Sequence, residues 1–462
     1  MLGMDALQRI ELMGQIVAVL FVMAFGACIG SLLNVLVYRL PLGLDVVTPT
    51  SRCPSCETYL TWRENIPVFG WLLLRGKCRF CRSPISPEYP LVEAFVAVLW
   101  AAVFLVLYAQ DGSFLGINFG AVQPEWGKGG FVATWPIFLT VLCLFSCLVA
   151  MTLVDAKTCF IPMQLTTTPV VFAVIAHPLA ALWVEHRYGK LPYAAPGQVW
   201  SMWTPGHQGW WWIGASIGGV AGLVISNILL HKKLIRRSFA DYEAWEKEQV
   251  EQQRLEAEAA AAATPTLPEG QLENPGPKAG ATPHPTDLWI QYPHARREML
   301  KELVFLAPAI SLALLGGAVA IRLAGPMEQN GFGGVTFAHQ APLWLVVLSG
   351  VFLGYLIGGG IVWLTRILGT LGFGKEAMGL GDVHMMAAVG ACIGWTDAVL
   401  GFFGAAFVGT LFAILGVIFS GAFKRAMPFG PYLAIGTVLV WFAKPAVEAL
   451  LSFLAKGPVN LP

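Results

Sequence analysis

Asp382 is an acidic side chain at the start of an apolar run. It follows a Gly-Leu-Gly triplet in the stretch KEAMGLGDVHMMAAVGACIGW (375–395). A carboxylate costs about 2.5–3.5 kcal/mol at the centre of a bilayer, so a membrane helix that carries one usually uses it for function. The two glycines remove side chains beside it, so a backbone or a substrate peptide can approach closely. The predicted supporting motif is Lys375, Glu376, Gly379 and Gly381.

A second carboxyl group, Asp155, ends another apolar run in LVDAKTCFIP. The order of apolar and charged segments predicts that Asp155 and Asp382 lie at the same membrane face. Two facing carboxyl groups do not both ionise easily, so one can activate water while the other donates a proton. The pair therefore predicts aspartic-peptidase chemistry, with Glu93 as a supporting acid. The alternative for either aspartate alone is a helix cap or an anchor at the headgroup level.

Two CxxC pairs lie in a polar segment, Cys53 with Cys56 and Cys78 with Cys81, separated by 21 residues. Each pair makes a tight turn that aims two thiolates at one point, and two such turns can surround zinc tetrahedrally. The alternative is two disulfides. Positive charge around the segment predicts a reducing, cytoplasmic location, which disfavours disulfides. We therefore expect a zinc site that supplies much of the folding energy of this short domain.

The composition indicates an all-α polytopic membrane protein. The chain has 462 residues, of which 56% are hydrophobic and only 12% are charged, whereas soluble domains carry about 25% charged residues. A net charge of +1 gives no indication of nucleic-acid binding. About ten transmembrane helices are expected from the apolar runs. They are 15–38, 91–108, 135–154, 165–184, 210–230, 303–323, 342–364, 383–395, 398–419 and 432–451.

Polar segments divide these helices into five predicted parts. Residues 1–39 hold the first helix, and 40–90 form a cytoplasmic zinc domain. Residues 91–230 hold further helices with the first catalytic aspartate. Residues 231–302 form a cytoplasmic insert, whose first half is a polar, helix-prone stretch and whose second half has the composition of a disordered linker. Residues 303–462 form the peptidase core with the GxGD motif.

Four stretches of the sequence match a known family pattern. They are GSLLNVLVYRLP (30–41), CPSCETYLTWRENIPVFGWLLLRGKCRFCRSPISPEYPLVE (53–93), KEAMGLGDVHMMAAVGACIGW (375–395) and MPFGPYLAIG (427–436). Through them the chain resembles the bacterial prepilin peptidases, or type IV leader peptidases, within the GxGD membrane aspartic proteases. Asp155 matches the position of that family's first catalytic aspartate, in a looser motif.

The resemblance implies an enzyme of the bacterial inner membrane with its active site at the cytoplasmic face. Such enzymes remove the leader peptide from prepilins or pseudopilins, which serve type IV pili and type II secretion. Many then methylate the new amino terminus with S-adenosyl-L-methionine, and the four-cysteine segment is associated with that step. The expected cofactors are therefore zinc and this methyl donor. The expected partners are pilin-like substrates and the lipid bilayer.

Three features depart from the family pattern. The stretch 210–323 is an addition, and it contains the polar insert. His384 stands where the family usually has Lys, and Met163 stands where Asp or Asn is common. None of the three removes a predicted catalytic group.

Two other functions remain open from the sequence. One is a peptidase without methyl transfer, because the sequence has no glycine-rich fingerprint for the methyl donor. The other is a proton-coupled transporter or scaffold. A transporter would need acids along a path through the bilayer and internal repeats, whereas Asp155 and Asp382 are predicted at one face.

Overall fold

The computed structural model describes residues 6–461 except 49, 190–199, 243, 246, 250, 253, 256–291, 330–334 and 421–427. The longer helices are α1 (Ala6–Arg39), α3 (Glu88–Tyr108), α4 (Phe131–Thr158), α5 (Met163–Tyr188), α6 (Trp210–His231), α8 (Ala295–Leu323), α9 (Leu343–Phe373), α10 (Leu380–Ile393), α11 (Trp395–Ser420), α12 (Gly430–Phe442) and α13 (Lys444–Ala455). A short helix, α2 (Phe69–Leu73), lies in the four-cysteine segment.

The remaining elements are small and lie in connections between helices. Residues Gln110–Gly112 and Glu125–Gly129 form single 3₁₀ turns. Strands β1 (Ser113–Phe114) and β2 (Ile117–Asn118) form one antiparallel hairpin, and β3 (Met327–Gln329) and β4 (Val335–Phe337) form another. All other regular elements of the described chain are helices, which confirms the predicted fold class.

Eight helices in the described residues are long and apolar enough to cross a membrane, or nine if α12 and α13 count as one broken span. Two of the ten expected helices differ from their predicted form. The run at 383–395 belongs to α10, which has only 14 residues. The run at 432–451 is divided between α12 and α13, which meet at an angle of 85°.

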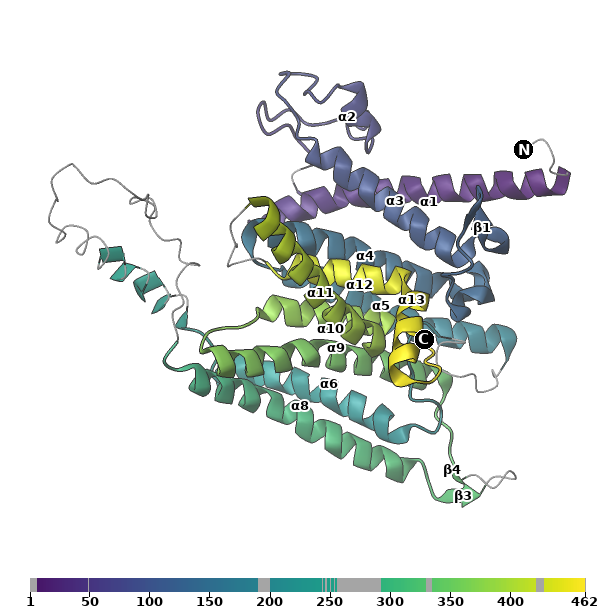
Figure 1. Cartoon of the computed structure of the whole chain (residues 1–462), viewed down its shortest axis with the longest axis vertical. Helices are drawn as coiled ribbons and strands as arrows, with labels where there is room; N and C mark the ends of the chain where they lie inside the picture. Colours follow the sequence, from purple (N-terminus) through teal and green to yellow (C-terminus); the bar gives the residue numbers. More distant parts are fainter. Residues whose placement is uncertain are drawn as a thin grey trace.

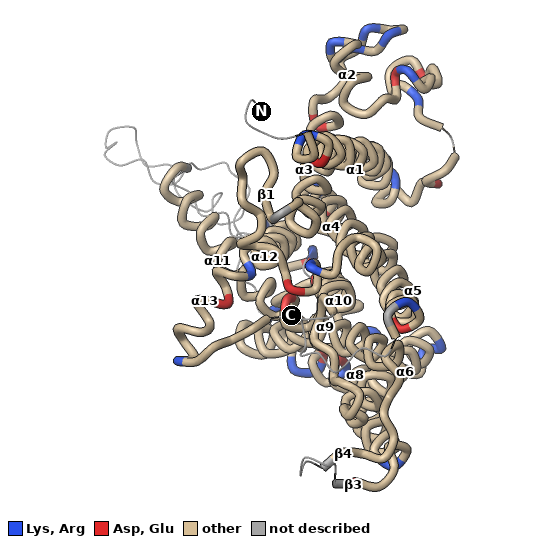
Figure 2. The backbone as a smooth tube through the Cα atoms, turned by 90° about the vertical axis from the view of Figure 1, so that its right-hand side faces the viewer, with Lys and Arg blue, Asp and Glu red and all other residues tan. Residues whose placement is uncertain are grey.

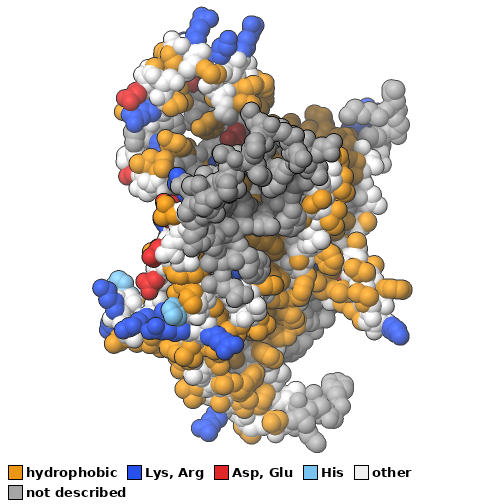
Figure 3. Space-filling view, turned by 60° about the vertical axis from the view of Figure 1, so that its left-hand side comes forward, with side chains coloured by type: hydrophobic (Ala, Val, Ile, Leu, Met, Phe, Trp, Pro, Cys, Tyr) orange, Lys and Arg blue, Asp and Glu red, His pale blue; other side chains and the backbone are white. Residues whose placement is uncertain are grey.

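The long helices lie side by side as an elongated bundle (Figure 1). The α1–α3 pair forms one edge and the α6–α8 pair the other, with α4, α5, α9, α10, α11 and α12 between them. Figure 2 shows the same helices nearly end-on, with Lys and Arg concentrated at helix ends and in the segment around α2. Hydrophobic side chains cover much of the surface between charged margins (Figure 3), as expected for helices that face lipid.

Small residues bring α10 close to α9. A Cβ on Gly354 would lie 1.9 Å from the carbonyl oxygen of Gly390, and one on Gly358 would lie 2.4 Å from that of Met386. Only the missing side chains permit this approach, as in other close helix pairs in membranes. This contact holds α10, which carries Asp382, against α9.

The far end of α10 is covered by the loop before α6. Met202 and Trp200 of this loop are buried, and a Cβ on Gly394 would lie 2.7 Å from the Cβ of Met202. The buried His177 of α5 accepts a hydrogen bond from Trp200 Nε1 at 3.1 Å. Its other ring nitrogen is 3.1 Å from the carbonyl oxygen of Cys392, a polar group at the end of α10. The loop therefore covers the C-terminal end of α10, and His177 contacts one of the carbonyl groups that the last turn of a helix leaves without a partner.

Candidate active site

Asp155 lies in the last turn of α4, where its carboxyl group is buried. The helix ends at Thr158, because Cys159 adopts a left-handed conformation with φ of 50°. Asp155 Oδ2 accepts a hydrogen bond of 3.1 Å from the backbone N–H of Gly430, the first residue of α12. Backbone donors at a helix N-terminus stabilise negative charge. The carboxyl group thus meets the positive end of a helix that is distant in sequence.

Asp382 is the third residue of α10 and is also buried. Its carboxyl group accepts a hydrogen bond from the backbone amide of Gly379, which caps the helix. This contact resembles half of a capping box, so the carboxyl group also supports its own helix. A Cβ on Gly379 would lie 3.7 Å from Asp382 Oδ2, and one on Gly381 would lie 3.0 Å from the Cβ of Ile161. Gly381 therefore lets the start of α10 pack against the chain just beyond α4.

The structure brings the two aspartates together. Helix α10 contacts α4, and the carboxyl groups of Asp155 and Asp382 are close enough to interact electrostatically. Each has a backbone donor from a helix N-terminus, but the two donors come from different helices, α12 and α10. Two buried carboxyl groups that share a site can divide the roles of base and acid.

Arg366 is a residue near this pair that sequence reasoning missed. Its side chain is 1% exposed, and its charge acts on Asp382. One terminal nitrogen of the guanidinium donates to the Glu376 carboxylate and to the carbonyl oxygen of Met378. Arg366 thus holds the loop that leads into Asp382, and Glu376 of the predicted supporting motif is its partner. An arginine inside the apolar run of α9 was a signal that could have identified it.

The other side of Arg366 faces residues of the stretch 210–323, which the sequence comparison predicts to be an addition. Its Nε donates to Glu302 Oε1 at 3.2 Å, and its guanidinium carbon lies 5.0 Å from the centre of the Phe239 ring. Glu302 also accepts a hydrogen bond of 2.6 Å from Ser238 Oγ. The two ends of the predicted insert therefore contact the network around the GxGD loop.

The middle of the insert divides into two parts. The described residues between 242 and 255 are helical, as its polar, helix-prone sequence predicts. The expected disordered linker falls within 256–291, outside the described residues. Lys375, the first residue of the supporting motif, is half-buried in the loop before α10.

Glu93, the predicted supporting acid, contacts the four-cysteine segment. It is buried in α3, and its Oε2 accepts a hydrogen bond of 2.6 Å from the backbone N–H of Val68, just before α2. Gly30 of α1 lets α3 approach closely at Glu93, since a Cβ on Gly30 would lie 2.7 Å from the Cα of Glu93. Glu93 thus attaches the four-cysteine segment to the first membrane helices.

The four predicted zinc ligands converge. The sulfur atoms of Cys53, Cys56, Cys78 and Cys81 all lie within 4.8 Å of one another. Tetrahedral zinc with bonds of about 2.3 Å needs sulfur atoms about 3.8 Å apart, and the Cys53 and Cys81 sulfurs are 3.8 Å apart. None of the nine cysteines forms a disulfide. The donor set and its geometry fit zinc.

The two CxxC turns have the same backbone pattern. Cys53 N–H donates to Thr58 at 3.0 Å, and Cys78 N–H donates to Ser83 at 2.9 Å. Backbone amides of Cys56 and Ser55 hydrogen-bond the Cys53 sulfur and lower the pKa of this thiol to about 6. Thiolates are the form that binds metal, so the first turn favours the metal-binding form of Cys53.

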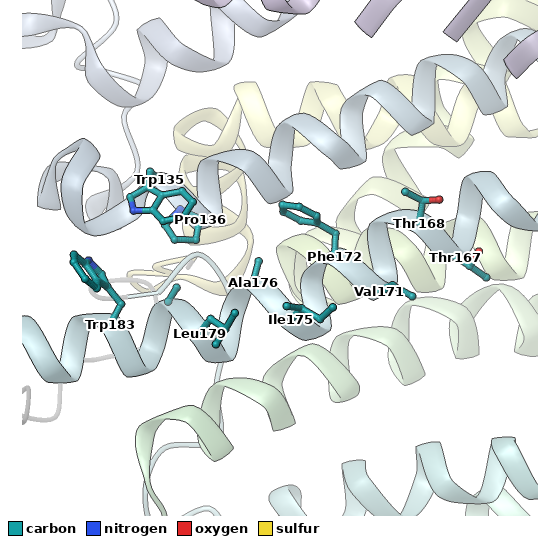
Figure 4. Close-up of a pocket in the computed structure, with 11 residues that line it drawn as sticks. Trp135, Pro136, Thr167, Thr168, Val171, Phe172, Ile175, Ala176, Leu179 and Trp183 are labelled. Carbon is teal, nitrogen blue, oxygen red and sulfur yellow. The ribbon is translucent and has the colours of Figure 1, made fainter. Parts of the chain in front are cut away.

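A groove of about 800 Å³ lies elsewhere, on the surface of α4 and α5 (Figure 4). Trp135 and Trp183 lie at one end and Thr167 and Thr168 at the other. Its lining is almost entirely apolar and includes neither aspartate. The groove is therefore separate from the candidate active site at Asp155 and Asp382.

Comparison with protein families matches two segments of the chain. Residues 24–107 match the bacterial peptidase A24 N-terminal domain, and residues 330–414 match the type IV leader peptidase family. The two matched segments together cover less than half of the chain. The first contains the four cysteines and Glu93, and the second contains Arg366 and Asp382. Asp155 lies between the two matched segments, so its assignment depends on the geometry described above.

Curated relatives match part of the chain. A protein of Myxococcus xanthus is 50% identical over 82 residues, which cover 18% of this chain and 24% of the relative. One of Aeromonas hydrophila is 34% identical over 169 residues, 31% of this chain and 50% of the relative. One of Klebsiella pneumoniae is 32% identical over 170 residues, 36% of this chain and 63% of the relative. All three are named prepilin leader peptidase/N-methyltransferase.

These matches cover only part of each relative. The chain spans about half the length of the Aeromonas hydrophila protein and a quarter of the Myxococcus xanthus protein. No solved structure matches the chain.

Proposed function

We propose that this chain is a membrane-embedded aspartic endopeptidase that removes the leader peptide from prepilins or pseudopilins. The observation that carries the proposal is the convergence of Asp155 and Asp382, two buried carboxyl groups from different helices. The names of the relatives support the class of substrate.

The reaction would use the two carboxyl groups in different protonation states. An ionised carboxylate removes a proton from water, and the resulting nucleophile attacks the carbonyl carbon of the scissile peptide bond. The protonated carboxyl group donates a hydrogen bond to the carbonyl oxygen. When the carbon–nitrogen bond breaks, a proton passes to the departing amine, and the leader keeps a new carboxylate. No covalent link between enzyme and substrate forms in this scheme.

Backbone and side-chain contacts would hold the pair for this chemistry. The Gly430 and Gly379 amides fix one oxygen of each aspartate. Arg366 fixes the loop before Asp382 through Glu376 and Met378. Because none of these groups depends on substrate, the site is organised before substrate binds, which lowers the cost of reaching the transition state.

We propose that the membrane face at which Asp155 and Asp382 lie is the cytoplasmic face. Lys157 lies two residues beyond Asp155, and the chain leaves α6 through Lys232, Lys233, Arg236 and Arg237. Positive residues in short segments beside membrane helices favour the cytoplasmic side. The proposed location is therefore the bacterial inner membrane, with residues 40–90 and 231–302 on the side of the active site.

Methyl transfer to the new amino terminus is a further part of the proposal. It is supported by the names of the relatives and by the match of residues 24–107 to the bacterial peptidase A24 N-terminal domain. Zinc would hold the two CxxC turns together through Cys53, Cys56, Cys78 and Cys81. The described part of 40–87 has one short helix and two isolated bridges, without a nucleotide-binding strand–turn–helix. We therefore assign no residue to the methyl donor.

Substitution of each aspartate tests the peptidase proposal. Asp155→Asn and Asp382→Asn should each abolish cleavage of a co-expressed prepilin, because asparagine keeps the shape but cannot exchange the proton. The double variant should be no worse than either single variant, as for residues that act as a unit. Glu328→Gln, at an exposed acid of β3, is the matched control. Near-normal cleavage by either aspartate variant would remove that residue from the pair.

A further inference from the structure

The four-cysteine domain exposes apolar side chains on one side of α2. Phe69, Leu72 and Leu73 are 64%, 54% and 77% exposed. Trp71 points the other way, because its indole donates a hydrogen bond of 3.1 Å to the carbonyl oxygen of Ile85 and lies against Gly76. The domain therefore fixes this helix through Trp71 and leaves three large apolar side chains without a partner in the described chain. We call these three side chains the α2 tip.

The α2 tip lies at a depth where the neighbouring helix is apolar. Val68, just before α2, is held by Glu93, five residues into α3 and thus about 7.5 Å along that helix. The first residue of α3, Glu88, pairs with Lys157 near the end of α4. This exposed ion pair marks the charged level of the membrane face. The attachment of α2 is therefore on the apolar side of that level.

The position of the domain places α2 beside the bundle. Figure 1 shows α2 alongside the first part of α3, and Figure 2 shows it outside the outline of the other helices. On α3 itself, Leu91 and Phe95 are 66% and 57% exposed. They lie at the same level as Glu93 and form part of a membrane-spanning helix. The space beside α2 is thus the space that lipid occupies around α3.

Basic side chains follow the tip directly. Arg75 and Lys77 are both exposed, and they lie two and four residues after Leu73. Apolar side chains flanked by Lys and Arg are typical of segments that lie in the interface of an anionic membrane. The charge next to the tip therefore favours lipid headgroups over an uncharged apolar partner.

We propose that the four-cysteine domain docks onto the bilayer in which the protein is embedded. The α2 tip enters the headgroup region, and Arg75 and Lys77 contact anionic headgroups. This contact would fix the height of the four-cysteine domain relative to the membrane. The inference depends on the membrane location of the chain and not on peptidase activity, so the two can fail separately.

Photo-cross-linking of the full-length protein tests the contact. The protein is placed in nanodiscs of phosphatidylethanolamine and phosphatidylglycerol, with p-benzoylphenylalanine in place of Phe69 or Leu73. Mass spectrometry should detect adducts with lipid at both positions, as at the control position Leu411, an exposed residue of the membrane helix α11. The same label at Gln252, an exposed residue of the polar helical segment, should give none. Adducts with protein alone, or none at 69 and 73, would overturn the proposal.

A charge substitution tests the electrostatic part and uses variants that keep the tip intact. Lys77→Gln should speed hydrogen exchange of the α2 amides about fivefold in nanodiscs with phosphatidylglycerol, since one basic residue near an anionic surface contributes ~1 kcal/mol. In nanodiscs of phosphatidylcholine alone, wild type and variant should exchange alike. Arg254→Gln, in the polar helical segment, is the charge-matched control. Equal exchange of wild type and Lys77→Gln in anionic nanodiscs, with zinc content unchanged, would overturn the role of the basic residues.

Discussion

Gly430→Ala should impair cleavage by moving Asp155. The added methyl carbon would lie 2.6 Å from Asp155 Oδ2 and 3.1 Å from its Cγ. Ordinary contacts begin near 3.4 Å, so the carboxyl group or the start of α12 must shift by about 0.8 Å. A displacement of about 1 Å in a catalytic group can cost about 100-fold in rate. We therefore expect a loss of kcat of that order, with a smaller effect on KM.

Helix stability does not explain such a loss. Gly430 begins α12, and alanine within a helix is more favourable than glycine by roughly 0.5–1 kcal/mol. The variant should therefore insert like the wild type, and thermal unfolding measures any loss of stability from the displaced contact. Gly360→Ala in α9 is the matched control, because a Cβ at that position would meet no atom within 4 Å.

The assay follows cleavage of a prepilin by detergent-purified protein, with initial rates measured at several substrate concentrations. Gly360→Ala should keep the wild-type rate. If Gly430→Ala keeps it as well, Asp155 does not need the position described here, and its role as half of the catalytic pair would be refuted. Equal losses in both variants would instead point to a general effect of glycine replacement.

Four other predictions concern the buried network, the four cysteines and the insert. Arg366→Gln should impair folding or cleavage strongly, because breaking a buried ion pair costs about 3–5 kcal/mol. When Glu302→Gln is added to Arg366→Gln, the further loss should be smaller than the loss that Glu302→Gln causes in the wild type, as measured by thermal unfolding and initial rate. Cys78→Ser should lose bound zinc by elemental analysis and impair methylation more than cleavage, whereas full methylation would separate metal from methyl transfer. In the wild type, zinc should be retained above the Cys53 pKa of about 6 and lost as pH falls below it, because protons then compete for the thiolate; retention at pH 4 would contradict this. Deletion of 256–287 should leave cleavage intact, because closure cost changes slowly with loop length; inactive but inserted protein would show that the segment recruits substrate or orders the site.

The sequence predicted the features that depend on local pattern. CxxC spacing predicted the convergence of Cys53, Cys56, Cys78 and Cys81, and the structure confirms it. Apolar runs predicted the membrane helices, although the α12–α13 bend and the short α10 were not expected. The end of α10 is covered by Met202 of the loop before α6 and by His177 of α5, two segments far from α10 in sequence. From the sequence alone, such an apolar run predicts a membrane-spanning helix, because the local pattern does not show which distant segment covers its end.

The prediction of the site was limited for the same reason. Asp155 and Asp382 were expected at one face, but neither sequence motif indicates the amide of Gly430 as a partner. Glu93 was expected at the same face as a supporting acid, and its sequence context did not indicate that it accepts a hydrogen bond from Val68. The buried network around Arg366 joins four separate segments of chain, and such contacts follow from packing and not from spacing along the sequence. The catalytic roles of the two aspartates stay predictions.

The central claim is that two carboxyl groups activate water to cut a peptide bond. The most direct measurement is the mass of the leader peptide released from a purified prepilin in the presence of hydroxylamine. The account predicts a single cut by the wild type, a leader that ends in a free carboxylate, and no leader with Asp382→Asn. A leader that ends in a hydroxamate would reveal a covalent acyl-enzyme and contradict the account, as would a normal cut by Asp382→Asn.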